Sequence, residues 1–244
     1  MSRPARLTLL GVVTFVICLC AFAPASLVRY LLRDAQQVTL VGLTGTVWRG
    51  GGDLALTGIH VGRIEWSFAP SALLSGDLGF DVALSGTNVD LGGRATASAR
   101  TVHLALTGRI DTALLRDTFA RYDLQIPGSV AVEHLDLTAD YQSRLPQVRG
   151  ELKWTGGDVA YRLSGRDHRV TLPPLVGFVA STSGQPEISV YQVDDKMPLM
   201  LAKVAQDGLA TVGITKQFTK MLGEPWPGGE PDHAVVLEVG EKLF

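Results

Sequence analysis

Apolar and polar residues alternate along most of the chain after Val38, and this two-residue period is typical of a half-buried β-strand. Several of these segments end in Thr or Ser followed by glycine, which reaches positive φ at little cost and lets the chain reverse sharply. The pattern predicts a mainly β fold, an antiparallel meander built as a long curved sheet or a sandwich. The segments are Val38–Gly45, Asp53–Gly58, Gly62–Phe68, Asp77–Gly86, Thr101–Gly108, Val132–Tyr141 and Asp158–Gly165.

Three other segments have a helical pattern. Asp111–Asp123 begins with a capping residue and repeats apolar side chains at helical spacing. Met197–Gly208 has Pro198 in its first turn and Gly208 as a C-terminal stop, and Thr215–Leu222 is a shorter candidate. We therefore expect two or three short helices packed against the sheet.

The N-terminal region contains an uncharged apolar run of 22 residues, Leu7–Val28. As a helix it would be about 33 Å long, enough to cross the hydrocarbon core of a membrane. Because Arg3 and Arg6 precede it, the positive-inside rule places residues 1–6 in the cytoplasm and residues 29–244 outside. The alternative is a signal peptide cleaved near Ala23-Pro24-Ala25, but the run exceeds the usual signal core of about 7–15 residues. The sequence therefore favours an uncleaved transmembrane helix over residues 7–28.

The region after this run is expected to be one continuous β-rich domain. Its proline-containing breaks are too short to serve as interdomain linkers. Gly45–Leu56 and Gly150–Tyr161 both contain a Trp followed by Gly-Gly-Asp and an apolar residue. This similarity suggests two related halves, at about residues 38–125 and 126–244.

Charge and cysteine usage exclude some classes of protein. The formal net charge is −2, and lysine and arginine are spread along the chain, so we predict no nucleic-acid partner. Both cysteines, Cys18 and Cys20, lie in the apolar run, so no disulfide is expected in the rest of the chain.

The sequence contains no motif that indicates catalysis. The histidines are isolated from one another, so no metal site is predicted. Gly50-Gly51-Gly52 is followed by an alternating strand pattern, with no lysine placed to bind a phosphate. The nucleophile motif Gly-x-Ser-x-Gly is also missing. We predict a protein that is not an enzyme and has no cofactor.

Two stretches, Val38–Gly52 and Gly62–Leu78, resemble protein N of the type II secretion system. Four more share this likeness: Gly150–Tyr161, Leu172–Leu175, Asp207–Thr215 and Glu224–Val239. The resemblance implies a single-pass protein of the bacterial inner membrane, with its bulk in the periplasm and other type II secretion components as partners. It implies no catalytic residues.

The resemblance also places a set of Trp, Gly and Pro residues at family positions: Trp48, Gly50, Trp66, Pro70, Trp154, Gly156, Gly157, Pro225 and Trp226. We expect each Trp to pack over a glycine-rich strand, where the missing Cβ leaves room for the indole. A direct role in partner contact is the alternative for these residues.

Two functions follow from these observations. The first is a non-enzymatic accessory subunit of type II secretion, whose strand edges or apolar surface contact other components. The second is a lipid-handling module, in which one apolar face of the curved sheet forms a groove for acyl chains. The mean hydropathy of +0.20, raised by the N-terminal run, motivates the second.

Overall fold

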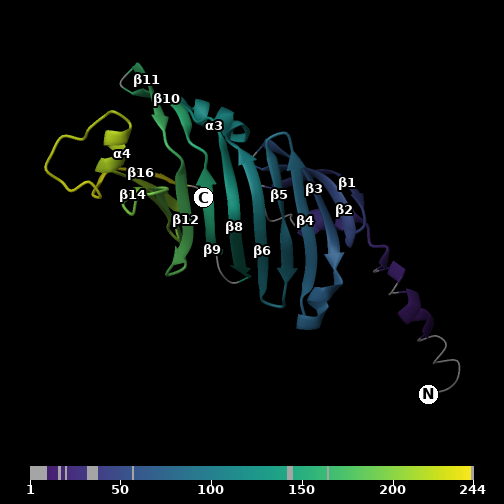
Figure 1. The fold of residues 1–244 in the computed structure, drawn as a ribbon. Helices are drawn as coiled ribbons and strands as arrows, with labels where there is room; N and C mark the ends of the chain where they lie inside the picture. Colours follow the sequence, from purple (N-terminus) through teal and green to yellow (C-terminus); the bar gives the residue numbers. More distant parts are fainter. Residues whose placement is uncertain are drawn as a thin grey trace.

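The computed structural model describes residues 10–15, 18–19, 21–31, 38–56, 58–141, 145–163 and 165–242. Its main feature is a 13-stranded antiparallel sheet, and the predicted meander is confirmed (Figure 1). Its strands, in sheet order, are β1 (Val38–Gly45), β2 (Arg49–Leu56), β3 (Ile59–Ala69), β4 (Leu78–Gly86), β5 (Val89–Ala97), β6 (Thr101–Asp111), β8 (Ser129–Asp140), β9 (Gln147–Trp154), β12 (Leu175–Thr182), β13 (Gln185–Gln192), β14 (Pro198–Val204), β15 (Leu209–Thr215) and β16 (Val235–Lys242).

A second, three-stranded sheet interrupts this order. It consists of β11 (Arg166–Leu172), β10 (Gly157–Leu163) and β7 (Leu124–Gln125), with β10 in the middle. The chain therefore leaves the large sheet twice, after β6 and after β9, and each time it returns to continue the meander.

The alternating sequence pattern gives the large sheet one apolar and one polar face. On β4, Phe80, Val82 and Leu84 are half-buried, while the intervening residues are exposed. The strand register continues this row across five neighbouring strands of the sheet. The successive partners on β6, β8, β9, β12 and β13 are Leu106, Leu135, Gly150, Val179 and Ile188. The opposite face holds ion pairs between neighbouring strands, such as Arg94 with Asp81 at 2.7 Å.

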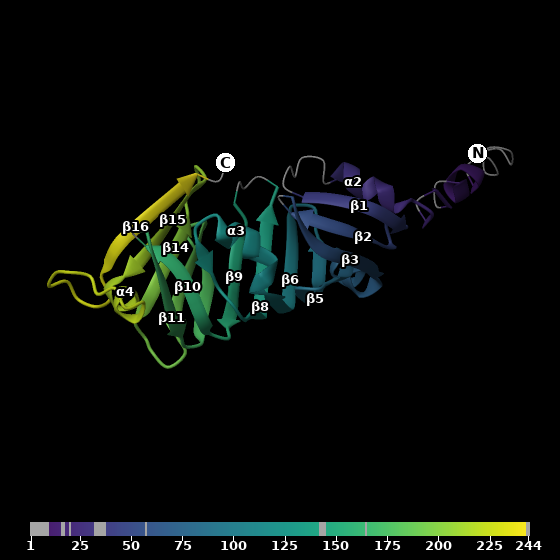
Figure 2. The ribbon, with the colours of Figure 1, turned by 90° about the horizontal axis from the view of Figure 1, so that it is seen from above.

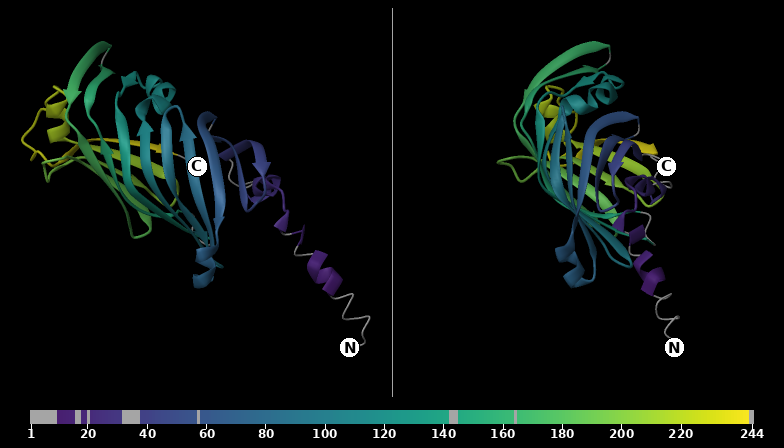
Figure 3. Two further views of the ribbon diagram at one scale, coloured as in Figure 1. Left: turned by 45° about the vertical axis from the view of Figure 1, so that its right-hand side comes forward. Right: turned by 90° about the vertical axis from the view of Figure 1, so that its right-hand side faces the viewer.

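The sheet is strongly curved, as Figures 2 and 3 show. Bulges give a physical reason, because an extra residue on one strand increases its bend and twist. The register shifts next to Val41, Leu54, Leu106, Val132 and Val190.

Two of the three predicted helices are confirmed. The expected helix at Asp111–Asp123 is formed by η3 (Thr112–Leu115) and α3 (Arg116–Ala120), capped by the Asp111 carboxylate, which accepts from the Ala113 N–H at 2.8 Å. The expected helix at Thr215–Leu222 is α4 (Lys216–Met221). A short helix that the pattern did not predict, η2 (Pro70–Ser75), follows β3.

The third predicted helix, Met197–Gly208, is wrong. Most of this segment is strand β14, which pairs with β13 on one side and β15 on the other. Leu199 on this strand is fully buried, at 0% exposure. Two hydrogen-bonded neighbours and a buried leucine outweigh the local helical pattern, because tertiary packing overrides a weak intrinsic propensity.

The prediction of one continuous helix over residues 7–28 is wrong at its C-terminal end, and its first residues lie outside the described part. The backbone is helical at residues 10–15, 18–19 and 21. Pro24 is extended and forms a bridge with Thr46, because proline lacks an N–H and disfavours helix in the residue before it. The chain then turns through η1 (Ala25–Leu27) and α2 (Val28–Leu31), and Val28 packs on the sheet.

None of the helices found among the described residues combines the length and the apolar character needed to cross a membrane.

The buried side chains form two clusters at the two ends of the sheet. The first is centred on Leu40, Leu54, Val61 and Val89, with Val28 and Leu114 packed against it. The second is centred on Val159, Leu172, Leu175, Leu199 and Phe218. The division into two similar halves stays a prediction.

Candidate functional site

Gly50 and Trp66 are the first pair of family positions that the structure brings together. They are register partners on β2 and β3. A Cβ added to Gly50 would lie 2.7 Å from Cζ2 of Trp66 and 2.6 Å from the Thr44 carbonyl oxygen. The Trp66 indole N–H donates to the Val47 carbonyl at 3.0 Å. The glycine therefore leaves the space that the indole occupies.

Trp48 lies in the turn before β2 and extends this arrangement with an aromatic row. Its ring is edge-on to Phe68 at a centroid distance of 5.2 Å, and Phe68 is edge-on to Phe80 at 5.7 Å. Pro70 follows β3 as the first residue of η2. The run Gly50-Gly51-Gly52 is thus part of a sheet with packed aromatic rings, and not a phosphate-binding loop.

Trp154 ends β9 at the other cluster. Its indole N–H donates to the Pro127 carbonyl at 2.9 Å. Gly156 and Gly157 follow with φ of +79° and +147°, and the chain turns here from the large sheet into β10. A Cβ on Gly156 would lie 2.7 Å from the Leu172 carbonyl oxygen, so this turn needs glycine for both conformation and space.

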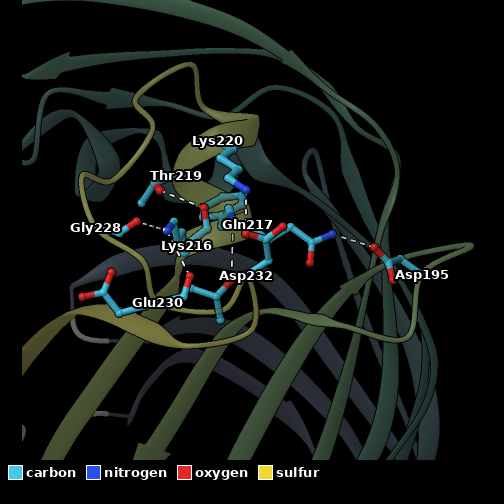
Figure 4. A network of polar contacts seen from close by, with 10 residues as sticks. Asp195, Lys216, Gln217, Thr219, Lys220, Gly228, Glu230 and Asp232 are labelled. Atoms are coloured by element: carbon cyan, nitrogen blue, oxygen red, sulfur yellow. Dashed lines mark hydrogen bonds and ion pairs between the residues drawn. The ribbon is translucent and has the colours of Figure 1, made fainter.

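Pro225 and Trp226 lie in the loop between α4 and β16, at the opposite end of the sheet from β1 (Figure 1). Figure 4 shows how α4 holds this loop. The buried Lys216 ammonium donates to the carbonyls of Gly228, at 2.5 Å, and Glu230, at 3.0 Å. Lys220 pairs with Asp232 at 2.5 Å, and this contact lowers the pKa of the Asp232 carboxyl.

The nine predicted residues therefore do not form one site. Trp48, Gly50 and Trp66 gather at the N-terminal end of the sheet, and Trp154 with its glycines at the C-terminal end. Whether they act in packing or in partner contact stays a prediction.

The most distinctive feature of the described chain is a cavity whose lining residues the sequence did not identify, although an apolar groove on the curved sheet was one hypothesis. Its volume is about 520 Å³. Six consecutive strands of the large sheet contribute to one wall, with Val130, Leu152, Leu175, Val190, Met200 and Ile214. Side chains of six neighbouring strands can surround one space only where the sheet is concave toward them.

Other elements cover the cavity from the opposite side. Phe119 of α3, Leu124 of β7 and Val159 of β10 belong to this cover. Tyr122, just after α3, donates a hydrogen bond to the carboxylate of Glu241 on β16 at 3.3 Å, although the two lie 119 positions apart. The sheet and its cover thus meet again at the last strand.

The cavity lining is apolar and contains no charged side chain. Its polar side-chain groups already donate to backbone carbonyls: Thr112 to Gly128 at 2.8 Å, Trp154 to Pro127 at 2.9 Å and Tyr161 to Leu222 at 2.9 Å. Burial, with a smaller contribution from nearby Glu224, raises the pKa of Tyr161, so its hydroxyl stays protonated at neutral pH.

A second cavity of about 670 Å³ adjoins the first and shares Thr112, Phe119, Leu124 and Ile126 with it. Its lining is partly apolar, and we call it the polar cavity because it also contains charged side chains. Its lining adds Asp111, Asp117, Asp158 and a single basic residue, Arg116.

The described residues also include a stacked pair beside the apolar cavity. The rings of Tyr161 and His168 are 5.1 Å apart and nearly parallel, and His168 Nδ1 lies 3.1 Å from the Glu224 carboxylate. In the part of the chain that the structure describes, no three His, Cys, Asp or Glu side chains are close enough to hold a metal ion.

Comparison with models of known protein families gives a match. The family described as "Type II secretion system (T2SS), protein N" matches residues 36–224, which is most of the chain. Neither the curated proteins nor the solved structures contain a significant match.

Proposed function

Since the chain belongs to the type II secretion system protein N family, we propose that it is a non-enzymatic accessory subunit of type II secretion. An N-terminal anchor in the inner membrane holds a periplasmic β domain, which contacts other components during export of folded proteins. The observation that carries this proposal is the family match, which extends across the large sheet from before β1 to beyond α4.

The apolar N-terminal run supports the anchoring part of the proposal. It is uncharged over Leu7–Val28 and follows two arginines, as expected for a cytoplasmic N-terminus. Among the described residues, 10–22 lie beyond the edge of the sheet at β1 (Figure 1). A segment projecting from the domain in this way is suited to insertion in a bilayer.

The last strand of the sheet supports the proposed contact with other secretion components. Among the residues that the structure describes, β16 pairs with β15 on one side only and forms the end of the sheet. Val235, Leu237 and Val239 on this strand are 42%, 42% and 57% exposed. An unpaired edge with exposed apolar side chains can accept a strand from another protein, with backbone hydrogen bonds providing affinity.

The test is a secretion assay in a strain from which the gene is deleted, complemented with variants of the chain. Wild type is expected to restore export of a folded substrate. A chimera in which a cleavable signal peptide replaces residues 1–22, and which keeps the contacts of Pro24 and Val28 with the sheet, is expected to restore less, because tethering raises the effective concentration at the machinery. Full export without any copy of the gene would contradict the accessory role, and full export by the chimera would contradict the anchor.

Contact through β16 is tested by a photo-crosslinking residue at Val239. Crosslinks to identified secretion components are expected from this position. The matched control is the same residue at Gly92, on the polar face of β5, where open space surrounds the backbone. Equal crosslinking from both positions would contradict a role for the edge.

A further inference from the structure

The apolar cavity has the dimensions of a ligand site. Its volume of about 520 Å³ falls within the usual range of about 300–1,000 Å³ for small-molecule pockets. It lies within the second hydrophobic cluster, yet its wall includes a residue without a side chain, Gly177 of β12. The nearest atoms to a Cβ added there would be 3.9 Å away. A side chain at this position would therefore begin in ordinary van der Waals contact with Ile188 and Leu152, without a clash.

The chemistry of the lining selects the ligand. Thr112, Trp154 and Tyr161 already donate their hydrogen bonds to the protein backbone, and no charged group lines the cavity. A peptide or sugar placed there would leave its own polar groups unpaired, which costs several kcal/mol for each group on the order-of-magnitude scale of transfer to an apolar medium. A hydrocarbon chain has no such groups and gains from leaving water.

The adjoining polar cavity complements one kind of headgroup. Three carboxylates, Asp111, Asp117 and Asp158, outnumber the single guanidinium of Arg116. A headgroup with a phosphate and an ammonium group matches this mixture, since Arg116 attracts the phosphate and the carboxylates attract the ammonium. A purely anionic headgroup would face the excess of carboxylates.

The protein's own apolar segment is not placed to fill the cavity. Figure 1 shows the described residues 10–22 beyond β1, whereas the cavity lies among β8 to β15 at the other end of the sheet. The apolar face of the sheet extends between these two ends, and the pairs Leu106–Leu135, Leu135–Gly150 and Gly150–Val179 continue across it beside the bulges next to Leu106 and Val132. A lipid chain can reach the cavity along this face.

We propose that the apolar cavity binds one acyl chain of an aminophospholipid, whose headgroup occupies the adjoining polar cavity.

The test uses the full chain purified in mild detergent, extracted with organic solvent and analysed by mass spectrometry for bound lipid. Gly177→Leu fills the cavity from a strand position with room for a side chain. The matched control is Gly92→Leu on the polar face of β5, where a new side chain also meets open space. Lipid held around the N-terminal segment is the same in all three proteins. A difference in bound lipid between the two variants therefore measures the lipid held in the cavity.

We expect wild type and Gly92→Leu to retain about one aminophospholipid per chain beyond that background, and Gly177→Leu to retain roughly tenfold less, which corresponds to about 1.4 kcal/mol of binding free energy. Circular dichroism and thermal melting check that both variants fold. If Gly177→Leu unfolds, Gly177→Val is the second variant, with the same expectation. Equal retention by the two variants, a cavity-dependent lipid that is only anionic, or a cavity-dependent peptide or dimer in place of lipid would overturn the proposal.

Discussion

Gly50 and Trp66 face each other across two neighbouring strands, and the indole of Trp66 occupies the space where a side chain of residue 50 would be. Gly50→Ala would place a methyl group 2.7 Å from the ring and 2.6 Å from the Thr44 carbonyl oxygen. We expect this variant to lose about 1–3 kcal/mol of unfolding free energy, because extra atoms in a packed site force neighbours to move. Urea denaturation of the full chain in detergent measures this loss. Gly92→Ala, where no atom lies within 4 Å, is the control and is expected to change stability by less than about 0.5 kcal/mol.

The Trp154 indole joins the end of β9 to the Pro127 carbonyl. Trp154→Phe keeps an aromatic ring but removes the hydrogen-bond donor, so we expect the free energy of unfolding to fall by about 0.5–1.5 kcal/mol. Thermal melting and urea titration measure it. Trp226→Phe changes a tryptophan of the loop after α4 and serves as the matched control. Equal losses in the two variants would show that the hydrogen bond to Pro127 has no special role.

Lys216 fixes the loop after α4 from a buried position, by donating to the carbonyls of Gly228 and Glu230. Lys216→Met fills a similar volume but leaves both carbonyls without this donor. Because hydrogen bonds to charged groups contribute about 1.5–3 kcal/mol, we expect the free energy of unfolding to fall by an amount in this range. We also expect faster proteolysis between Gly223 and Asp232. Lys203→Met, at an exposed lysine of β14, is the control. Proteolysis in this loop at the wild-type rate would contradict the role of Lys216.

The ion pair of Lys220 with Asp232 predicts a pH dependence of the same loop. The hydrogen bond from Lys220 lowers the pKa of Asp232 below its ordinary value of 3.8. A depressed folded-state pKa contributes stability that is present above pH 3.8 and is lost as the pH falls through the folded-state value. We therefore expect the protection of the loop amides, measured by hydrogen exchange relative to the intrinsic rate at each pH, to fall below pH 3.8. Asp232→Asn should remove this fall in protection, and a variant that keeps it in full would contradict the assignment to Asp232.

Local signals explain the parts of the fold that the sequence determined. Alternation over four to eight residues is enough to predict β1, β4 and β10, because the two faces of a strand differ in burial wherever the strand lies. Capping by Asp111 and Thr215 depends on neighbours two or three positions away, so both helices could be predicted from the chain itself.

The candidate site followed from the sequence only in part. The clustering of Trp and Gly indicated close packing, but the partner of each indole depends on strand register: Trp66 contacts Gly50 and Val47, and Trp154 donates to Pro127, 27 positions earlier. The cavity gave no local signal. Its wall joins Phe119 of α3 to Ile214 of β15.

The order of apolar and polar residues dictates the two-faced character of each strand, and with it the antiparallel class of the fold. Contacts between distant segments decide that Met197–Gly208 is mainly a strand and that the apolar face bends round a cavity. Local patterns cannot predict these two features, because burial and strand pairing act between residues far apart in the chain. A segment between two neighbouring strands is stabilised more by pairing with them than by its own helical propensity.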